Sequence, residues 1–416
     1  MPEEERRRRM QKMRAQVAEV VERLRTTKRP VILAGSGVRL AGAVELLRNT
    51  ASILGIPVTT AWTAHDLIPT DHPCCAGRPG TVGDRAGNFV VQSADLLLVL
   101  GSRLNLRQVS YNWDNFAPSA YKIQVAIDGA EMRKPTVQPN LSIVADVREF
   151  LEEFGDVCRC YPLAKEKWTD WLAWCRKRVA ENPVVTAKMR EQTDTINPYV
   201  FIEALFDCLE GDDVVVCGDG TACVVPFQVG RIKANTRMWT NSGCAAMGYD
   251  VPAAIGAAVA RGGKRVICLA GDGSIMLNLQ ELQTIAHHKL PVKIFVLNNA
   301  GYLSIRQTQD NFFGRRAGEG PTSGLSFPDF VKIATGFGIT DYQIDARSDI
   351  QSEVEGALTL RGPTLVNVML DPTQPFEPKI STRRNKDGTL TSATLEDMAP
   401  FLSVEELEKN MWRDGR

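Results

Sequence analysis

The sequence has no long apolar segment and no excess of charge of either sign. No uninterrupted apolar run approaches the roughly 20 residues that a membrane-spanning helix needs. Lys plus Arg number 49 and Asp plus Glu number 49, so net charge does not favour binding to nucleic acid or to an anionic membrane. The N-terminal sequence MPEEERRRRMQKM lacks the apolar centre of a signal peptide. We therefore expect a cytoplasmic protein that binds neither nucleic acid nor membrane.

Sulfur and imidazole ligands for metals are also scarce. The 416 residues include ten cysteines and four histidines. The cysteines nearest in sequence, Cys74 with Cys75 and Cys158 with Cys160, lack the CxxC spacing of a zinc site. The pattern favours reduced, incidental thiols over a zinc centre or a disulfide framework.

Short apolar runs alternate with helix-like segments in two stretches of the chain. Continuous runs of this kind are typical of parallel strands that helices cover on both faces. The runs are 31–35, 96–101, 123–128, 214–216, 265–270, 292–297 and 364–369. We predict an α/β protein with two doubly wound, Rossmann-like parallel-sheet domains joined by a helical linker.

The predicted boundaries follow changes in composition. Residues 1–24 have the charge and apolar spacing of an amphipathic lead-in helix, and the polar stretch before 195 is rich in tryptophan. The predicted parts are a lead-in helix at 1–24, a central domain at 25–155, a helical linker at 156–195, a second domain at 196–370 and a tail at 371–416. We expect the tail to be extended chain followed by a short helix that packs on a neighbouring domain or subunit.

The most specific pattern pairs a Gly-Asp-Gly turn with an Asn-Asn turn. Asp272 follows one predicted strand and Asn299 follows the next, so both should lie where open α/β sheets bind ligands. A carboxylate, an amide oxygen and a loop carbonyl near Gly301 suit Mg²⁺, and the amides of Gly273 and Ser274 suit phosphate. Each turn alone is an ordinary feature, but together they predict a metal–diphosphate site. Residues 275–286 are expected to form one helix after the first turn.

With this spacing the sequence resembles the thiamine-diphosphate enzymes and, more narrowly, the acetolactate synthase group. The resemblance covers most of residues 20–370. It implies thiamine diphosphate and Mg²⁺ as cofactors, with the metal held by Asp272, Asn299 and the backbone oxygen of Gly301. The cofactor contacts that it implies are Asp219, Gly220, Thr221, Ala245, Met247, Gly271, Gly273, Ser274 and Tyr302.

Within that set, the resemblance gives Met247 the catalytic role. Segment 243–256 is similar to the family segment beneath the cofactor. There a bulky apolar residue separates the two cofactor rings, and a backbone oxygen, here near Ala245, accepts a hydrogen bond from the 4′-amino group. The alternative for Met247 is an ordinary core methionine. Thr221 and Ala222 stand where the family has an amide and an imidazole.

The central domain resembles the family domain that holds FAD in a structural role. The flavin contacts implied by this match are Gly35, Ser36, Gly37, Arg103, Asn105, Arg107, Asp128 and Asp146. Two departures stand against it, because Gly42 is too distant to complete GxGxxG and the family's GMHG is replaced by Gly77-Arg78-Pro79-Gly80. FAD and a domain that kept the fold but lost the ligand remain open.

The resemblance implies a carboligase of branched-chain amino acid biosynthesis. Such an enzyme decarboxylates a 2-keto acid, pyruvate, and transfers the two-carbon unit to a carbonyl acceptor, with most of the chemistry in the cofactor. In the family an activating glutamate comes from an N-terminal pyrimidine-binding domain, which we do not find in these residues. Glu281 is the nearest substitute, but a helix-surface role suits it better. We therefore expect a homo-oligomer or a complex with a chain that supplies that domain.

Two alternatives stay open and one is disfavoured. A keto sugar in polysaccharide biosynthesis is an alternative acceptor, suggested by segment 111–118 and by the tail. A non-catalytic cofactor-binding or regulatory subunit is the alternative from another functional class. A nicotinamide dehydrogenase is disfavoured, because neither glycine loop has GxGxxG with an acidic residue about 20 positions later.

Overall fold

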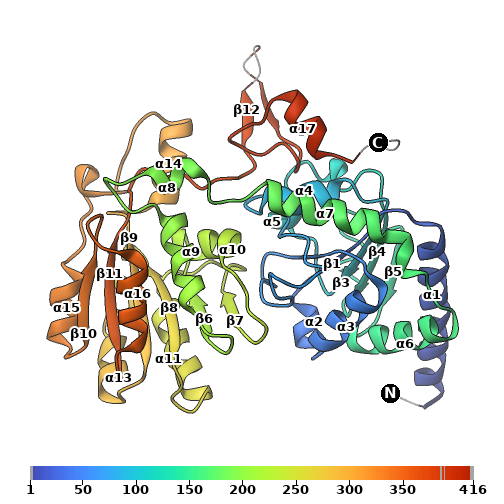
Figure 1. Cartoon of the computed structure of the whole chain (residues 1–416), viewed down its shortest axis with the longest axis horizontal. Coiled ribbons are helices and arrows are strands. Elements are labelled where there is room, and N and C mark those ends of the chain that lie inside the picture. Colours follow the sequence, from blue (N-terminus) through green and yellow to red (C-terminus); the bar gives the residue numbers. More distant parts are fainter. Residues whose placement is uncertain (1–2, 385–386, 388, 413–416) are drawn as a thin grey trace. The chain divides into compact units, whose positions relative to one another are not determined.

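The computed structural model describes residues 3–384, 387 and 389–412. The chain forms two compact units (Figure 1). The first unit contains the described residues up to Pro183 and from Glu377 onward, and the second is Val184–Phe376. Within the described residues, no helix combines the length and apolarity needed to cross a membrane.

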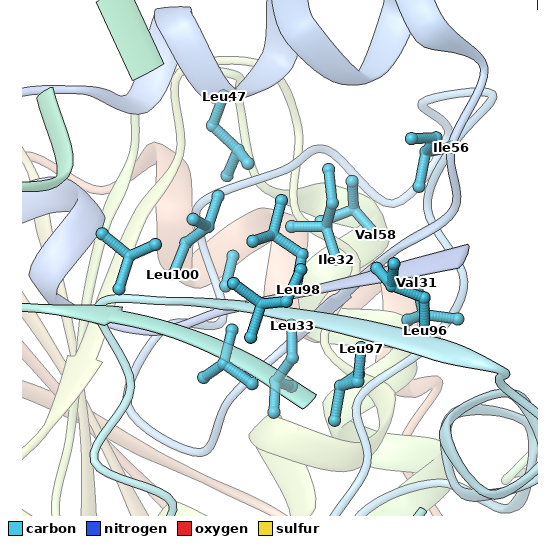
Figure 2. Close-up of a cluster of buried hydrophobic side chains, with 14 of the residues drawn as sticks. Val31, Ile32, Leu33, Leu47, Ile56, Val58, Leu96, Leu97, Leu98 and Leu100 are labelled. Atoms are coloured by element: carbon cyan, nitrogen blue, oxygen red, sulfur yellow. The ribbon is translucent and has the colours of Figure 1, made fainter. Parts of the chain in front are cut away.

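The first unit is built on a parallel sheet with strand order β2-β1-β3-β4-β5. Its strands are β1 (Pro30–Ala34), β2 (Val58–Thr60), β3 (Leu96–Leu100), β4 (Tyr121–Ala126) and β5 (Leu141–Val144). Every residue of β1 and β3 is buried, as expected for central parallel strands covered on both faces. Figure 2 shows Ile32, Val58 and Leu98 on the face toward Leu47, while Leu33 points to the opposite face.

Helices cover both faces of this sheet. They are α1 (Glu3–Thr26), α2 (Gly37–Leu40), α3 (Val44–Leu54), α4 (Arg85–Gln92), α5 (Leu106–Val109), α6 (Val147–Cys160) and α7 (Thr169–Glu181). Helix α1 runs beside α6 (Figure 1) and buries its apolar positions from Met13 to Leu24 in the core. The amphipathic spacing of the lead-in segment therefore corresponds to a helix that packs along one stripe.

Two tryptophans of the polar stretch before residue 183 belong to the core of the first unit. Trp168 and Trp171 are buried, and their ring N–H groups donate to the carbonyls of Thr27 and Pro30 at 3.1 and 2.9 Å. The tail joins this cluster, because the ring of Trp412 meets that of Trp171 edge-on at 5.5 Å. The tail contains the antiparallel hairpin β12 (Thr382–Arg384) and β13 (Leu390–Ser392) and then α17 (Val404–Asn410). The hairpin is an addition to the extended chain that we expected there.

The second unit is built on another parallel sheet, with strand order β10-β11-β9-β8-β6-β7. Its strands are β6 (Val214–Cys217), β7 (Arg237–Thr240), β8 (Val266–Gly271), β9 (Val292–Asn298), β10 (Thr340–Ile344) and β11 (Thr364–Met369). Its helices are α8 (Ala187–Glu191), α9 (Pro198–Cys208), α10 (Thr221–Val229), α11 (Asp250–Ala260), α12 (Asp272–Ile275), α13 (Glu281–His287), α14 (Leu303–Phe312), α15 (Phe330–Gly336) and α16 (Ile350–Thr359). The predicted α/β class with two doubly wound parallel sheets is confirmed.

The order of strands in the second sheet locates its ligand-binding edge. From β6 the chain passes first to β7 on one side and then to β8 on the other. The loops after β6 and β8 therefore leave the sheet in opposite directions. A crevice at the carboxyl ends of the strands, at such a switch point, is where open α/β sheets bind ligands.

Candidate functional site

The Gly-Asp-Gly and Asn-Asn turns lie side by side at the carboxyl edge of the second sheet. Strands β8 and β9 are paired in parallel with Gly271 opposite Leu297. Asp272 starts α12 directly after β8, and Asn299 follows the last residue of β9. The parallel pairing of two apolar runs is therefore what brings the two polar turns together.

Asp272 is a buried carboxylate that backbone amides hold in place. Only 3% of the residue is exposed. Its Oδ1 accepts a hydrogen bond from the N–H of Gly273 at 2.7 Å, and its Oδ2 accepts one from the N–H of Gly301 at 2.9 Å. Burial raises the pKa of Asp272 to about 6, against the opposing effect of these amides and of Arg306. A bound cation would favour the ionised form of this carboxylate.

Asn299 links the second turn to the loop after β6. Its amide nitrogen donates to Oγ1 of Thr221 at 3.1 Å, and the amide oxygen takes no part in this hydrogen bond. Asp272 and Gly301 are hydrogen-bonded to each other, and Asn299 is two residues from Gly301. The structure thus brings the three predicted metal-ligand residues into one small region.

The oxygen atoms at this edge are of the chemical types that Mg²⁺ binds. A carboxylate, a side-chain amide oxygen and a backbone carbonyl are the hard donors that Mg²⁺ takes together with substrate phosphate. Among the described residues, no group of three or more His, Cys, Asp or Glu side chains is arranged to hold a metal ion. A metal at this edge therefore needs amide and backbone oxygens in addition to Asp272.

Tyr302 covers the backbone of the Gly-Asp-Gly turn. A Cβ atom at Gly273 would lie 2.1 Å from Cε1 of the Tyr302 ring, so only glycine fits here without movement of that ring. The ring also packs edge-on against Phe327 with 5.8 Å between centroids. Gly273 and Tyr302, both implied as cofactor contacts, are therefore direct neighbours.

The hydroxyl of Ser274 is occupied by hydrogen bonds to other residues of the protein. Its Oγ donates to Oδ2 of Asp250 at 2.5 Å and accepts from the N–H of Gly248 at 2.9 Å. The backbone amide of Ser274, near the start of α12, is the group that remains for a phosphate. The side-chain contacts connect α12 to the loop that carries Met247.

Asp250 is a buried acid that the sequence analysis did not identify. It is fully buried at the start of α11. Burial raises its pKa to about 6, and the nearby charge of Asp219 acts in the same direction. Its only signal in the sequence is a carboxylate inside the apolar stretch 247–259, and such a residue is buried only when it has hydrogen-bond partners.

Gly248, the residue after Met247, is held through both of its backbone polar groups. The N–H of Gly248 donates to Ser274, and its carbonyl accepts from Nδ2 of Asn278 at 2.7 Å. Met247 itself is half-buried, and Ala245 is exposed with a φ of 52°. The two residues lie in an irregular loop that is anchored to the segment after the Gly-Asp-Gly turn.

That segment corrects one prediction. We expected a single helix over 275–286, but α12 ends at Ile275, a 3₁₀ turn covers Met276–Asn278, and α13 starts at Glu281. The tighter turn coincides with the hydrogen bond from Asn278 to Gly248, and 3₁₀ turns within helical segments are common where the local geometry is constrained. Glu281 accepts a hydrogen bond from Thr284 at 2.9 Å in the first turn of α13.

The loop after β6 supplies the remaining predicted contacts in this unit. Gly220 has a φ of 58° and precedes the first residue of α10, which is Thr221. Partial burial raises the pKa of Asp219. Gly218 is tightly packed, because a Cβ atom there would lie 2.6 Å from Oδ2 of Asp250. Asp219, Asp250 and Ser274 therefore belong to one acidic region beside the Asp272 turn.

In the first unit the predicted flavin-binding glycines pack against backbone. A Cβ atom at Gly35 would lie 2.4 Å from the carbonyl oxygen of Gly101, and one at Gly37 would lie 2.7 Å from Cα of Gly101. The N–H groups of Gly35 and Gly37 donate to the carbonyls of Leu100 and Gly101 at 2.8 and 3.0 Å. The close contact between the loops after β1 and β3 is therefore enough to explain why glycine is present at both positions.

The polar residues predicted to contact flavin also have local partners. Asn105 accepts from the N–H of Gln108 at the start of α5, and Asp146 accepts from two N–H groups at the start of α6. Asp128 accepts from the N–H of Ala130 at 2.8 Å. Arg103 pairs with Glu131 at 3.6 Å. Arg107 is exposed, and Ser36 precedes α2.

Comparison with known proteins agrees with the architecture. Residues 17–154 match the family described as thiamine pyrophosphate enzyme, central domain. Residues 218–368 match the family described as thiamine pyrophosphate enzyme, C-terminal TPP binding domain. The second match includes both turns of the candidate site.

Individual relatives have acetolactate synthase names. The chain is 31% identical over 360 residues to the acetolactate synthase isozyme 1 large subunit of Escherichia coli (strain K12), which covers 86% of this chain and 61% of the relative. It is 32% identical over 367 residues to the isozyme 2 large subunit of the same organism, with 86% and 62% covered. It is 31% identical over 369 residues to the acetolactate synthase large subunit of Pyropia yezoensis, with 88% and 61% covered.

The alignments with these relatives cover only part of each relative. The chain spans about three fifths of the length of the curated relatives it matches, and its two domain matches are to a central and a C-terminal domain. Taken with the two parallel sheets and the paired turns, these findings show that the chain belongs to the thiamine pyrophosphate enzyme family, among the proteins that resemble acetolactate synthase large subunits.

Proposed function

We propose that this chain binds thiamine diphosphate with Mg²⁺ and takes part in the decarboxylation of a 2-keto acid such as pyruvate, with transfer of the two-carbon unit to a carbonyl acceptor. The observation that carries the proposal is the hydrogen bond between Asp272 and Gly301 at 2.9 Å. It joins the two turns that we propose as the metal–diphosphate site, and Asn299 is two residues from Gly301. Thiamine diphosphate, when bound, supplies the chemistry that accepts the electron pair released by decarboxylation.

The residues of the chain have separate roles in this proposal. Asp272, Asn299 and the carbonyl of Gly301 hold Mg²⁺, and the backbone amides near Gly273 and Ser274 meet the diphosphate. Gly271 and Tyr302 border the same turn, while Asp219, Gly220 and Thr221 approach from the loop after β6. Met247 supports the cofactor rings, and Ala245 offers the backbone oxygen beside them.

A complete cofactor site needs a pyrimidine-binding domain from outside these 416 residues. We propose that this domain contributes the glutamate that activates the cofactor. It belongs either to a longer polypeptide that includes this chain or to a separate partner. We propose a homo-oligomer or a complex of two kinds of chain as the assembly, and we retain a cytoplasmic location as a prediction.

The acceptor and the flavin are finer parts of the proposal. A second pyruvate would make the chain part of an acetolactate synthase in branched-chain amino acid biosynthesis, and a keto sugar would place it in polysaccharide biosynthesis. FAD in the first unit stays a prediction of the resemblance. Its residues there, Gly35 and Gly37 among them, already have structural partners.

The test is pyruvate-dependent release of CO₂ by the purified chain with thiamine diphosphate, Mg²⁺ and FAD, with and without an added pyrimidine-binding domain. We expect calorimetry to detect Mg²⁺-dependent binding of thiamine diphosphate, and turnover only when the domain is present. Cofactor binding without turnover in any pairing would favour the non-catalytic subunit. No cofactor binding would contradict the proposal.

The role of Met247 has its own test. Met247→Ala should leave diphosphate binding unchanged and slow exchange of the C2 proton of the cofactor in the reconstituted complex. Exchange at the wild-type rate would mean that Met247 only fills space.

A further inference from the structure

Arg306 and Glu319 form a buried ion pair next to the Asn-Asn turn. The side chains are 8% and 1% exposed, and Nε of Arg306 donates to Oε2 of Glu319. Arg306 lies in the first half of α14, and Glu319 lies after that helix. Burial of a charged pair is costly unless further hydrogen bonds satisfy it, so the remaining partners of the guanidinium are informative.

Those partners are backbone carbonyls of the metal-ligand loop. Nη1 of Arg306 donates to the carbonyl of Asn299 at 3.4 Å, and Nη2 donates to the carbonyl of Ala300 at 3.1 Å. Nη1 also donates to the carbonyl of Pro372 at 2.5 Å, after β11. One guanidinium therefore fixes the two peptide groups that precede Gly301.

Glu319 holds the same loop through its backbone. Its carbonyl accepts from the N–H of Tyr302 at 2.8 Å. A Cβ atom at Gly301 would lie 2.0 Å from that carbonyl oxygen and 2.7 Å from Nη2 of Arg306. Because Gly301 also donates to Asp272, the loop is held between Asp272 on one side and the ion pair on the other.

We infer that Arg306 and Glu319 are positioning residues that set the orientation of the Asn299–Gly301 loop and, through it, the geometry of the Mg²⁺ site. The inference rests on the proposed function. Its physical basis is that Arg306 takes up the carbonyls of Asn299 and Ala300 and leaves that of Gly301 as a metal ligand. The planar fork of Arg can hold two carbonyls at fixed angles, and a lysine ammonium cannot.

A difference between metals separates positioning from general stabilisation. Mg²⁺ requires near-octahedral geometry with short bonds, whereas Ca²⁺ tolerates irregular coordination. A loop whose carbonyls are no longer fixed should therefore lose Mg²⁺ before it loses Ca²⁺. A merely structural role of Arg306 would weaken cofactor binding equally with either metal.

The experiment measures binding of thiamine diphosphate to the full chain by calorimetry as a function of Mg²⁺ or Ca²⁺ concentration. The variants are Arg306→Lys and Glu319→Gln, and Asp272→Ala serves as the reference for loss of the site. Arg265→Lys is the matched control, because Arg265 makes a two-point ion pair with Asp213, at 2.9 and 2.6 Å, before β8 in the same sheet. This control breaks an ion pair at the amino ends of β6 and β8, whereas the Asn-Asn turn lies at the carboxyl end of β9.

We expect Arg306→Lys to raise the half-saturating Mg²⁺ concentration at least about tenfold, the scale seen when groups that orient metal ligands are removed. The corresponding Ca²⁺ concentration should change by less than about threefold. Glu319→Gln should change both in the same direction by a smaller factor. Arg265→Lys should lower the unfolding temperature and leave both metal concentrations unchanged.

The outcomes distinguish this inference from the proposed function. Unchanged Mg²⁺ dependence in a folded Arg306→Lys protein, with binding lost in Asp272→Ala, would overturn only the positioning role. Equal shifts for Mg²⁺ and Ca²⁺ would also overturn it. Absence of metal-dependent binding in the wild-type chain, or unchanged binding in Asp272→Ala, would overturn both.

Discussion

Both sheets have glycine-rich turns at the carboxyl ends of their central strands, but the two units use those turns differently. In the first unit, Gly35 and Gly37 allow the loops after β1 and β3 to touch through their backbones. In the second unit, Gly273 lies under the ring of Tyr302, and the acids Asp250 and Asp272 are buried beside that turn. Glycine therefore allows two loops to touch through their backbones in the first unit. In the second unit it makes room for a side chain, the ring of Tyr302.

The comparison shows that a glycine turn after a parallel strand does not by itself indicate a ligand. Burial of carboxylates is costly, and in the second unit it raises the pKa values of Asp250 and Asp272 to about 6. Shifted carboxylates of this kind cluster at functional sites more often than elsewhere. In the first unit, Asp128 and Asp146 accept hydrogen bonds from local amides, and the acid whose pKa burial raises is Asp84, which is not among the predicted flavin contacts.

The largest expected effect distinguishes the two kinds of glycine. Gly35→Ala should destabilise the first unit by about 3 kcal/mol, because the new methyl group meets the backbone of Gly101 and cannot be accommodated by a side-chain movement. In Gly273→Ala the new methyl group meets the ring of Tyr302, which can turn away. It should weaken thiamine diphosphate binding more than it lowers the urea midpoint of unfolding. Equal destabilisation by the two substitutions would remove the distinction.

A smaller effect concerns the buried acid Asp250. Its folded-state pKa of about 6 lies above the unfolded value of 3.8, so the folded protein binds this proton more tightly. The contribution of Asp250 to stability therefore falls as pH rises through this window, by about 2 kcal/mol between roughly pH 4.5 and pH 7. Asp250→Asn should gain that amount relative to wild type over the same range, measured by urea unfolding at both pH values. A constant difference between the two proteins would show that Asp250 does not titrate there.

The smallest effect tests the acid in the first unit. Asp146→Ala removes two hydrogen bonds at the start of α6 and should cost about 1 kcal/mol, as is usual for a helix cap. Binding of thiamine diphosphate should stay at the wild-type level. If Asp146→Ala instead abolishes binding of FAD while stability is retained, the first unit binds flavin as the family resemblance implies.

The pattern of apolar residues predicted the central strands of both sheets but did not predict the edge strands. The predicted runs that became inner strands are mostly apolar, as in β1 and β3, because helices cover both faces. The strands that we did not predict, β2, β5, β7 and β10, are the edge strands of the two parallel sheets in the described part of the chain. They are either very short or mixed in polarity, as in Thr340–Ile344, because an edge is partly open to water.

The paired turns of the candidate site were visible in the sequence because each follows an apolar strand and the spacing links them. The hydrogen bonds of Ser274 with Asp250 and Gly248 were not visible, because neither partner follows a predicted strand and no motif spacing pairs either of them with Ser274. The hydrogen bonds from Arg306 to the carbonyls of Asn299 and Ala300 could not be predicted from the sequence either. Backbone carbonyls leave no signal in a sequence, so their partners appear only in the fold.

The most direct test of the account is calorimetric titration of the full chain with thiamine diphosphate at fixed Mg²⁺, comparing wild type with Asp272→Ala. We predict Mg²⁺-dependent binding by wild type and a loss of at least about a hundredfold in the variant, since a direct ligand matters at least as much as the groups that orient it. Equal affinity of the two proteins for the cofactor would contradict the assignment of the carboxyl edge of the second sheet as the metal–diphosphate site.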